Sequence, residues 1–150
     1  MIRVTAESLE EVNAFLAGSD LTLAGPTAEL WMQRDAAGHI TGTTGYELSG
    51  SNALIRSVAV RPELRTSGLG STLATYALDA AREAGAKTAW LFSRRSGPFW
   101  QKLGFEAATT NELAAALTDS AQVQLFRTTG QLEREVAWRR ELVDPPQARS

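Results

Sequence analysis

The residues best suited to chemistry in this 150-residue chain form the loop Arg65-Thr66-Ser67-Gly68-Leu69-Gly70. An apolar run, residues 54–60, precedes the loop, and a helical pattern begins at Leu69. A glycine-rich turn that opens a helix presents unpaired backbone N–H groups at the positive end of the helix dipole. The sequence therefore predicts an anion site, and we expect a phosphate group there.

Two common nucleotide-binding motifs differ from this loop. A P-loop requires lysine directly after its second glycine, whereas Gly70 is followed by Ser71 and Thr72. A dinucleotide-binding turn requires a third glycine where Leu73 stands and an acid after the next strand, which ends instead at Phe92-Ser93-Arg94. These differences exclude the P-loop and disfavour the dinucleotide turn.

The loop resembles the Gln/Arg-x-x-Gly-x-Gly/Ala motif of the Gcn5-related N-acetyltransferases, which binds the pyrophosphate of acetyl-coenzyme A. A glycine pair needed only for chain reversal would not explain three further segments that resemble the same family: Val58-Ala59-Val60-x-Pro62-Glu63-x-Arg65, Ala84-Gly85-Ala86 and Phe99-Trp100-Gln101-Lys102-Leu103-Gly104-Phe105. The resemblance implies an α/β fold with a mixed, mostly antiparallel sheet flanked by helices. It also implies direct acetyl transfer, in a ternary complex, from acetyl-coenzyme A to a small amine.

The resemblance assigns the cofactor contacts residue by residue. The strand around Ala59 is expected to pair with the pantetheine arm and to offer N–H groups to the thioester carbonyl. Arg65 and the loop amides are expected to hold the pyrophosphate. The predicted cofactor-binding residues are Val58, Ala59, Val60, Arg65, Thr66, Ser67, Gly68, Leu69, Gly70 and Ser71.

The chain departs from the family at Trp100, where many members have a tyrosine that protonates the leaving thiolate. An indole N–H is a donor but far too weak an acid for this role. Tyr46 and Tyr76 are expected to serve in packing, so the general acid is unassigned. A rival hypothesis therefore stays open, in which a catalytically degenerate family member binds coenzyme A as a structural or sensing ligand.

The acceptor side is expected at strand ends that flank the cofactor strand. Glu47 and Ser57 are predicted to be catalytic, with Glu47 taking the amine's proton through water. Arg56, Ser93 and Arg94 are predicted to bind the acceptor, and Arg95 is a further candidate. Because arginine binds carboxylates in a bidentate manner, an anionic or amino-acid-like acceptor is expected.

Two segments also resemble the arsenic-resistance-associated branch of the family. Gly45-Tyr46-Glu47 followed by residues 54–60 is similar to its Gly-Leu-Glu and Leu-Leu-Arg-Ser-Val-Ala-Val. Trp90-Leu91-Phe92-Ser93 with Phe99 is similar to its Tyr-Leu-Leu-Thr and Phe-Phe-x-x-Leu-Gly-Phe. However, Arg94-Arg95-Ser96 replaces the branch's threonine-rich segment, and its cysteine-containing C-terminal segment has no counterpart.

Composition excludes several other classes of protein. A formal charge of −2 from 17 acids and 15 bases gives no general attraction to nucleic acid or anionic membranes. The absence of cysteine excludes a disulfide framework, and a single histidine, His39, argues against a zinc site and predicts a surface turn residue. Without a signal-like or membrane-spanning segment, a cytoplasmic monomer or homodimer is expected.

Periodicity predicts the elements that position these residues. One domain is expected over residues 1–143, with a disordered tail at 144–150. Strands are expected at residues 2–4, 29–34, 40–48, 54–60, 87–93 and 123–126. Helices are expected at 8–18, where Ser8 and Glu11 predict a capping box, and at 69–84, 98–103, 111–117 and 131–143, the last an extra C-terminal helix.

Overall fold

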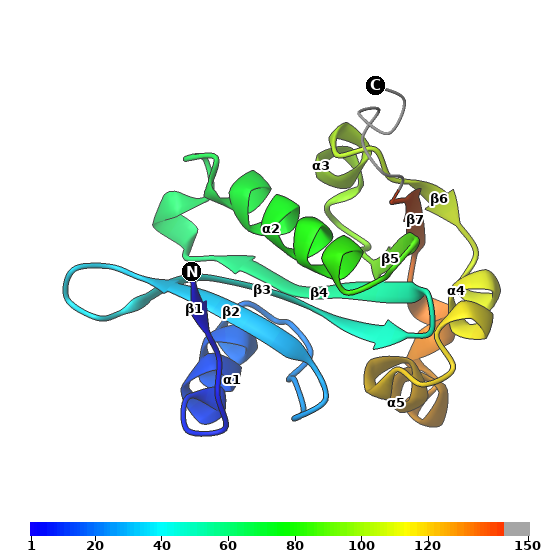
Figure 1. The fold of residues 1–150 in the computed structure, drawn as a ribbon, viewed down its shortest axis with the longest axis horizontal. Helices are drawn as coiled ribbons and strands as arrows, with labels where there is room; N and C mark the ends of the chain where they lie inside the picture. Colours follow the sequence, from blue (N-terminus) through cyan, green and yellow to red (C-terminus); the bar gives the residue numbers. More distant parts are fainter. Residues whose placement is uncertain (143–150) are drawn as a thin grey trace.

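A computed structural model describes residues 1–142 of the chain (Figure 1). Its centre is a seven-stranded sheet in the order β1-β2-β3-β4-β5-β7-β6. In these residues β4 and β5 are the one parallel pair, and the other neighbours are antiparallel. The mixed, mostly antiparallel sheet predicted from the sequence is confirmed. The strands are β1 Ile2–Arg3, β2 Glu29–Arg34, β3 Ile40–Ser49, β4 Asn52–Val60, β5 Thr88–Phe92, β6 Glu106–Ala108 and β7 Ala137–Glu141.

Helices cover both faces of this sheet, with α2 on one face and α1 on the other (Figure 1). One face of α2 is buried at Leu73, Ala74, Ala77 and Ala81, and its small residues let the helix pack closely on the strands. No helix in the described part of the chain is long and apolar enough to cross a membrane. The helices are α1 Leu9–Gly18, α2 Leu69–Glu83, α3 Gly97–Lys102, α4 Thr110–Ala116 and α5 Ala121–Thr129, with 3-10 turns η1 Pro62–Leu64 and η2 Gln131–Arg134.

A β-bulge in β4 and the short β4–β5 pairing open the sheet. Thr43 pairs with Ala59 but Gly45 pairs with Arg56, so one residue of β3 opposes two residues of β4. Ser57, at the bulge, has φ 60°, an unusual value for a residue other than glycine. The pairing of β4 with β5 ends at Leu54 and Trp90, and beyond this pair the two strands separate.

The predicted strand at residues 123–126 is wrong, because this segment lies inside α5. Ser120 caps the helix, with its Oγ accepting a hydrogen bond from Val123 N at 3.2 Å. Gly130, at φ 77°, ends it in the left-handed conformation. A short apolar run fits a strand or a buried helix equally well, and here the two caps select the helix.

The predicted extra C-terminal helix at residues 131–143 is also wrong over its described part. Residues 131–134 form η2, and Ala137–Glu141 forms β7 between β5 and β6. Pairing on both sides satisfies the backbone groups of β7, which outweighs a loose helical spacing of apolar residues. Trp138 is buried in the central core, and its Nε1 donates to Ser93 O at 2.9 Å.

The predicted capping box at Ser8 and Glu11 does not form. Ser8 caps α1 without a side-chain bond to the helix, and Glu11 binds Arg34 instead. A capping box is present at the start of α4, between Thr109 and Glu112. Val143 and the tail predicted to be disordered at 144–150 lie outside the described residues.

Candidate active site

A cavity of about 530 Å³ lies where β4 and β5 separate. Its walls come from residues 55–60 of β4, from residues 92–96 after β5 and from residues 19–22 after α1. Arg65 and Gly70 mark the end nearest α2. The remaining walls are formed by Phe99, Trp100, Gln122, Phe126, Gln131 and Glu135.

The predicted phosphate loop connects η1 to the N-terminus of α2. Gly68 has φ 88°, a left-handed conformation that glycine adopts at little cost. The backbone N–H groups of Gly68, Gly70 and Ser71 donate to no acceptor within residues 1–142. The Leu69 N–H differs, since it donates to Ser67 Oγ at 3.3 Å. The start of α2 thus keeps several free donors at the positive end of the helix dipole.

Glu47 and Arg56 form a buried ion pair beside the cavity. Arg56 Nη1 lies 2.5 Å from Glu47 Oε2, and each side chain is 4% exposed. Arg56 Nη2 donates to the carbonyls of Thr22 and Leu23, at 3.1 and 2.9 Å. Arg56 Nε donates to Ser57 Oγ at 3.2 Å. The guanidinium therefore binds β3, β4 and the segment after α1 together.

The second oxygen of Glu47 also has a partner, because Oε1 accepts from Ala121 N at 2.8 Å. Glu47 consequently bonds to the N-terminus of α5 as well as to Arg56. Of the predicted acceptor-side residues, Arg56, Ser57, Ser93, Arg94 and Arg95 line the cavity. Glu47 lies behind this wall, in contact with Arg56.

Some of the predicted cofactor-binding residues line the cavity, and the others lie next to it. Val58, Ala59, Val60, Arg65 and Gly70 line the cavity. Thr66, Ser67, Gly68, Leu69 and Ser71 lie in the adjoining loop and at the first turn of α2, outside the cavity wall.

No tyrosine stands among the cavity-lining residues of the described chain. Trp100 is buried, with its ring in edge contact with Phe99 and Phe105 at centroid distances of 4.9 and 5.5 Å. Tyr46 and Tyr76 both pack against Trp31, at 5.9 and 5.3 Å. The packing role predicted for these two tyrosines agrees with this arrangement.

Sequence reasoning missed the wall formed by α5 and η2. Four residues of this wall line the cavity: Gln122 lay in no predicted element, and Phe126, Gln131 and Glu135 lay in segments assigned to the wrong element. Glu135 is 7% exposed in its side chain, and its Oε2 accepts from Gln131 Nε2 at 2.8 Å. The caps Ser120 and Gly130 are the sequence features that could have placed α5 correctly.

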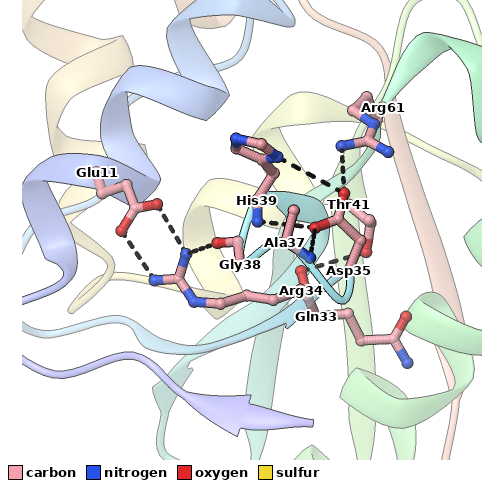
Figure 2. A network of polar contacts seen from close by, with 9 residues as sticks. All are labelled: Glu11, Gln33, Arg34, Asp35, Ala37, Gly38, His39, Thr41 and Arg61. Carbon is pink, nitrogen blue, oxygen red and sulfur yellow. Dashed lines mark hydrogen bonds and ion pairs between the residues drawn. The ribbon is translucent and has the colours of Figure 1, made fainter.

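His39 lies in the β2–β3 turn (Figure 2) and is not among the residues that line the cavity. Its side chain is 74% exposed, which agrees with the predicted surface position. Asp35 organises this turn by accepting from His39 N at 2.9 Å and Ala37 N at 3.0 Å, and it pairs with Arg61 (Figure 2). Residues 1–142 contain no cluster of three metal-ligating side chains.

Solved structures with related folds include several acetyltransferases. N-acetylglutamate synthase from Neisseria gonorrhoeae, complexed with coenzyme A and N-acetyl-glutamate, matches 96% of this chain with a TM-score of 0.73 and 16% identity. The match spans only 35% of the synthase chain. Rv2747 from Mycobacterium tuberculosis, in complex with CoA, matches 94% of this chain and 98% of its own, with a TM-score of 0.70 and 14% identity.

A GNAT-family acetyltransferase from Staphylococcus aureus Mu50 covers 95% of this chain and 98% of its own, with a TM-score of 0.71 and 14% identity. At these identities the likenesses establish a shared fold. Comparison with curated protein sequences gives no match. The family model described as Acetyltransferase (GNAT) family matches residues 7–105, about two thirds of the chain. The chain therefore belongs to the GNAT family of acetyltransferases.

Proposed function

We propose that this protein transfers the acetyl group of acetyl-coenzyme A to the amine of a small, anionic or amino-acid-like acceptor. The observation that supports this most directly is the cavity between the separated strands β4 and β5, which ends at the free amides of α2. The cavity offers both an unpaired strand edge and free amide donors at a helix N-terminus. A thioester with a long polar arm and a pyrophosphate needs both of these features.

The residues present fit coenzyme A. A Cβ atom added at Gly70 would lie 3.6 Å from Phe99 and 3.7 Å from Val60, which are ordinary contact distances. Packing within the protein therefore does not require glycine at position 70, and a close approach by a ligand does explain it. We propose that Arg65 and the amides of Gly68, Gly70 and Ser71 hold the pyrophosphate, and that residues 58–60 bind the pantetheine arm.

In the proposed reaction the neutral amine attacks the thioester carbonyl, the N–C bond forms and the C–S bond breaks. The amine loses one proton and the departing thiolate gains one. We propose that Glu47 takes the first proton through water and that Ser57 contributes its hydroxyl near the thioester. The existing bonds of Glu47 to Arg56 and Ala121 compete with this role. The variant Glu47→Gln therefore distinguishes a role in proton transfer from a role in positioning.

The acceptor is proposed to carry an anionic group near Arg56, Ser93 and Arg94. The bound N-acetyl-glutamate of the Neisseria synthase makes amino acids reasonable first candidates. No comparison supports the arsenic-resistance-associated branch, so arsinic and phosphinic amino acids belong in the panel as a separate arm. A cytoplasmic location and a monomeric or homodimeric state stay predictions from the sequence.

Two experiments test the proposal. Calorimetry with coenzyme A should give a 1:1 complex, and Gly68→Trp should abolish it while the protein stays folded. Arg82→Ala is the matched control, because Arg82 lies at the far end of α2 and pairs with Asp79. Absence of both heat and a thermal shift at high coenzyme A would overturn the proposal.

The rival function, a degenerate member that only binds coenzyme A, is favoured by the buried Trp100 at the usual tyrosine position. Release of free thiol from acetyl-coenzyme A distinguishes the two functions. The panel should contain amino acids, polyamines, aminoglycosides and the arsinic and phosphinic amino acids. Normal coenzyme A binding without thiol release on any of these would favour the rival.

A further inference from the structure

Two hydrogen-bond acceptors on the cavity wall, one buried in α5 and one partly buried directly after η2, have no donor in the described part of the chain. The Oε1 atom of Gln122 is buried and accepts no hydrogen bond within residues 1–142. The Oε1 atom of Glu135 likewise has no partner there, although its side chain is 7% exposed. Both residues line the same cavity. A buried acceptor without a donor is costly, and a buried carboxylate more so.

The charge of Glu135 is only weakly compensated. Arg94 Nε lies 3.6 Å from Glu135 Oε2, beyond hydrogen-bond distance, and the Arg94 side chain is 51% exposed. Gln131 donates to the same oxygen but carries no charge. An exposed arginine gains little from such a pair. The carboxylate is therefore available to a second cation that enters the cavity.

The position of Glu135 is fixed relative to the cofactor strand. Ser93 N donates to Val136 O at 2.9 Å, which holds the residue after Glu135 against the end of β5. Ser93 directly follows β5 and lines the cavity together with Ser57 of β4. Phe92 and Phe126 pack 5.0 Å apart and supply an apolar surface beside Gln122 in this wall.

We infer that Glu135 and Gln122 form the subsite that receives the ammonium group of the acceptor. The ligand class is a primary amine in its cationic form, whose N–H groups supply the donors that the two oxygens lack. This inference rests on the proposed function, since it names the part of the cavity that selects the acceptor. It adds a specificity-determining pair, Gln122 of α5 and Glu135 directly after η2, to the residues of β4 and of the segment after β5.

The test uses methylammonium chloride as the probe. The ¹⁵N-labelled protein is titrated at constant ionic strength, with and without coenzyme A, while the side-chain amide signal of Gln122 is followed. The expected result is a saturable shift of this signal in the wild type. In Glu135→Gln the apparent affinity should fall at least about tenfold, because a charged hydrogen-bond partner is lost. Tetramethylammonium, which has no N–H group, should not reproduce the shift.

Two further variants keep the test decisive. Glu133→Gln removes the same charge from an exposed neighbour in η2 and should titrate like the wild type. Gln122→Leu removes an unsatisfied acceptor, so it should unfold at the same or a higher denaturant concentration, and backbone amide signals should report weaker methylammonium binding.

The inference is overturned if the Gln122 signal stays unmoved, or if Glu135→Gln and tetramethylammonium give the wild-type response. Calorimetry with coenzyme A on the same samples distinguishes a failure of the ammonium subsite from a failure of the proposed acetyltransferase function. Normal coenzyme A binding without a methylammonium response rejects the subsite alone. If the wild-type protein does not bind coenzyme A, the proposed function is rejected, whatever the methylammonium result.

Discussion

Arg56 and Glu47 are in direct contact across β3 and β4, with Nη1 and Oε2 2.5 Å apart and both side chains 4% exposed. Every nitrogen of the guanidinium has a partner, and both carboxylate oxygens of Glu47 do as well. The pair thus bonds both the segment after α1 and the N-terminus of α5 to the strands β3 and β4.

Removing one member of this pair should destabilise the fold. Arg56→Ala leaves Glu47 buried without a counter-charge and frees the carbonyls of Thr22 and Leu23. The expected loss is about 3–5 kcal/mol in the free energy of unfolding, measured by urea denaturation. The double variant Glu47→Gln/Arg56→Met should be less destabilised than Arg56→Ala, and the reverse order would show that the ion pair is not the cause.

The Glu47→Gln variant separates a proton-transfer role from a positioning role. If the carboxylate takes the amine's proton, turnover should fall about 10²-fold while the affinity for coenzyme A is unchanged. Steady-state kinetics with the best acceptor from the panel measures this. A wild-type turnover number together with lower stability would assign Glu47 to positioning.

Ser57→Gly tests the hydroxyl at the bulge without disturbing the backbone. Glycine adopts the observed φ of 60° more readily than serine, which offsets the lost hydrogen bond from Arg56 Nε to Ser57 Oγ, so we expect only a small net change in stability. If the hydroxyl takes part in acetyl transfer, turnover should fall by about 10²-fold. Ser19→Gly, at a cavity-lining serine to which no role is assigned, is the matched control for loss of a hydroxyl. Unchanged turnover in Ser57→Gly would remove Ser57 from the catalytic residues.

Gly45→Ala should destabilise the sheet because β2 leaves no room for a side chain at this position. A Cβ atom there would lie 2.4 Å from Glu29 O and 2.5 Å from Leu30 Cδ2. Because the backbone oxygen of Glu29 cannot move aside, we expect the free energy of unfolding to fall by about 1–3 kcal/mol or more, measured by thermal or urea unfolding. Gly25→Ala has no atom within 4 Å of the added carbon and should unfold like the wild type.

Asp35 should contribute stability that is lost in acid. The hydrogen bond from His39 N, followed by the one from Arg61, holds the pKa of Asp35 below its ordinary value. A carboxylate with a lowered pKa stabilises the fold fully above the unfolded-state pKa of about 3.9 and progressively less as the pH falls through its folded value. The difference in stability between the wild type and Asp35→Asn should therefore be constant near neutral pH and shrink below about pH 4.

Unfolding curves from neutral pH to pH 2 would measure this dependence. Glu10→Gln, which removes an exposed carboxylate of α1 outside this turn, is the matched control. A difference for Asp35→Asn that stays constant through the acid range would contradict the expectation.

Local features of the sequence predicted the central part of the molecule well. The apolar run of β4, the glycine at position 68 and the small-residue face of α2 each express a local requirement of strand, turn or close packing. The contact between Glu47 and Arg56 depends on the register of β3 with β4, which places the two residues diagonally on one face and which the sequence alone left open.

The C-terminal third was predicted poorly because its structure depends on distant partners. β7 forms between β5 and β6, so its strand conformation is decided by residues far away in the sequence. The bond from Ala121 N to Glu47 joins positions 74 residues apart and has no local pattern. The cavity residues Gln122 and Glu135 were missed for the same reason, since nothing near them in the sequence places them beside β4.

The short parallel junction between β4 and β5 has a consequence for the order of folding. β2, β3 and β4 are consecutive antiparallel strands joined by short turns, so their contacts close small loops. β5 meets β7 through contacts such as Trp138 with Ser93, 45 positions apart, and the two halves of the sheet join through only three residue pairs. Because distant contacts form more slowly than local ones, we expect β2–β4 to assemble first and the cavity to appear late, when the C-terminal strands arrive.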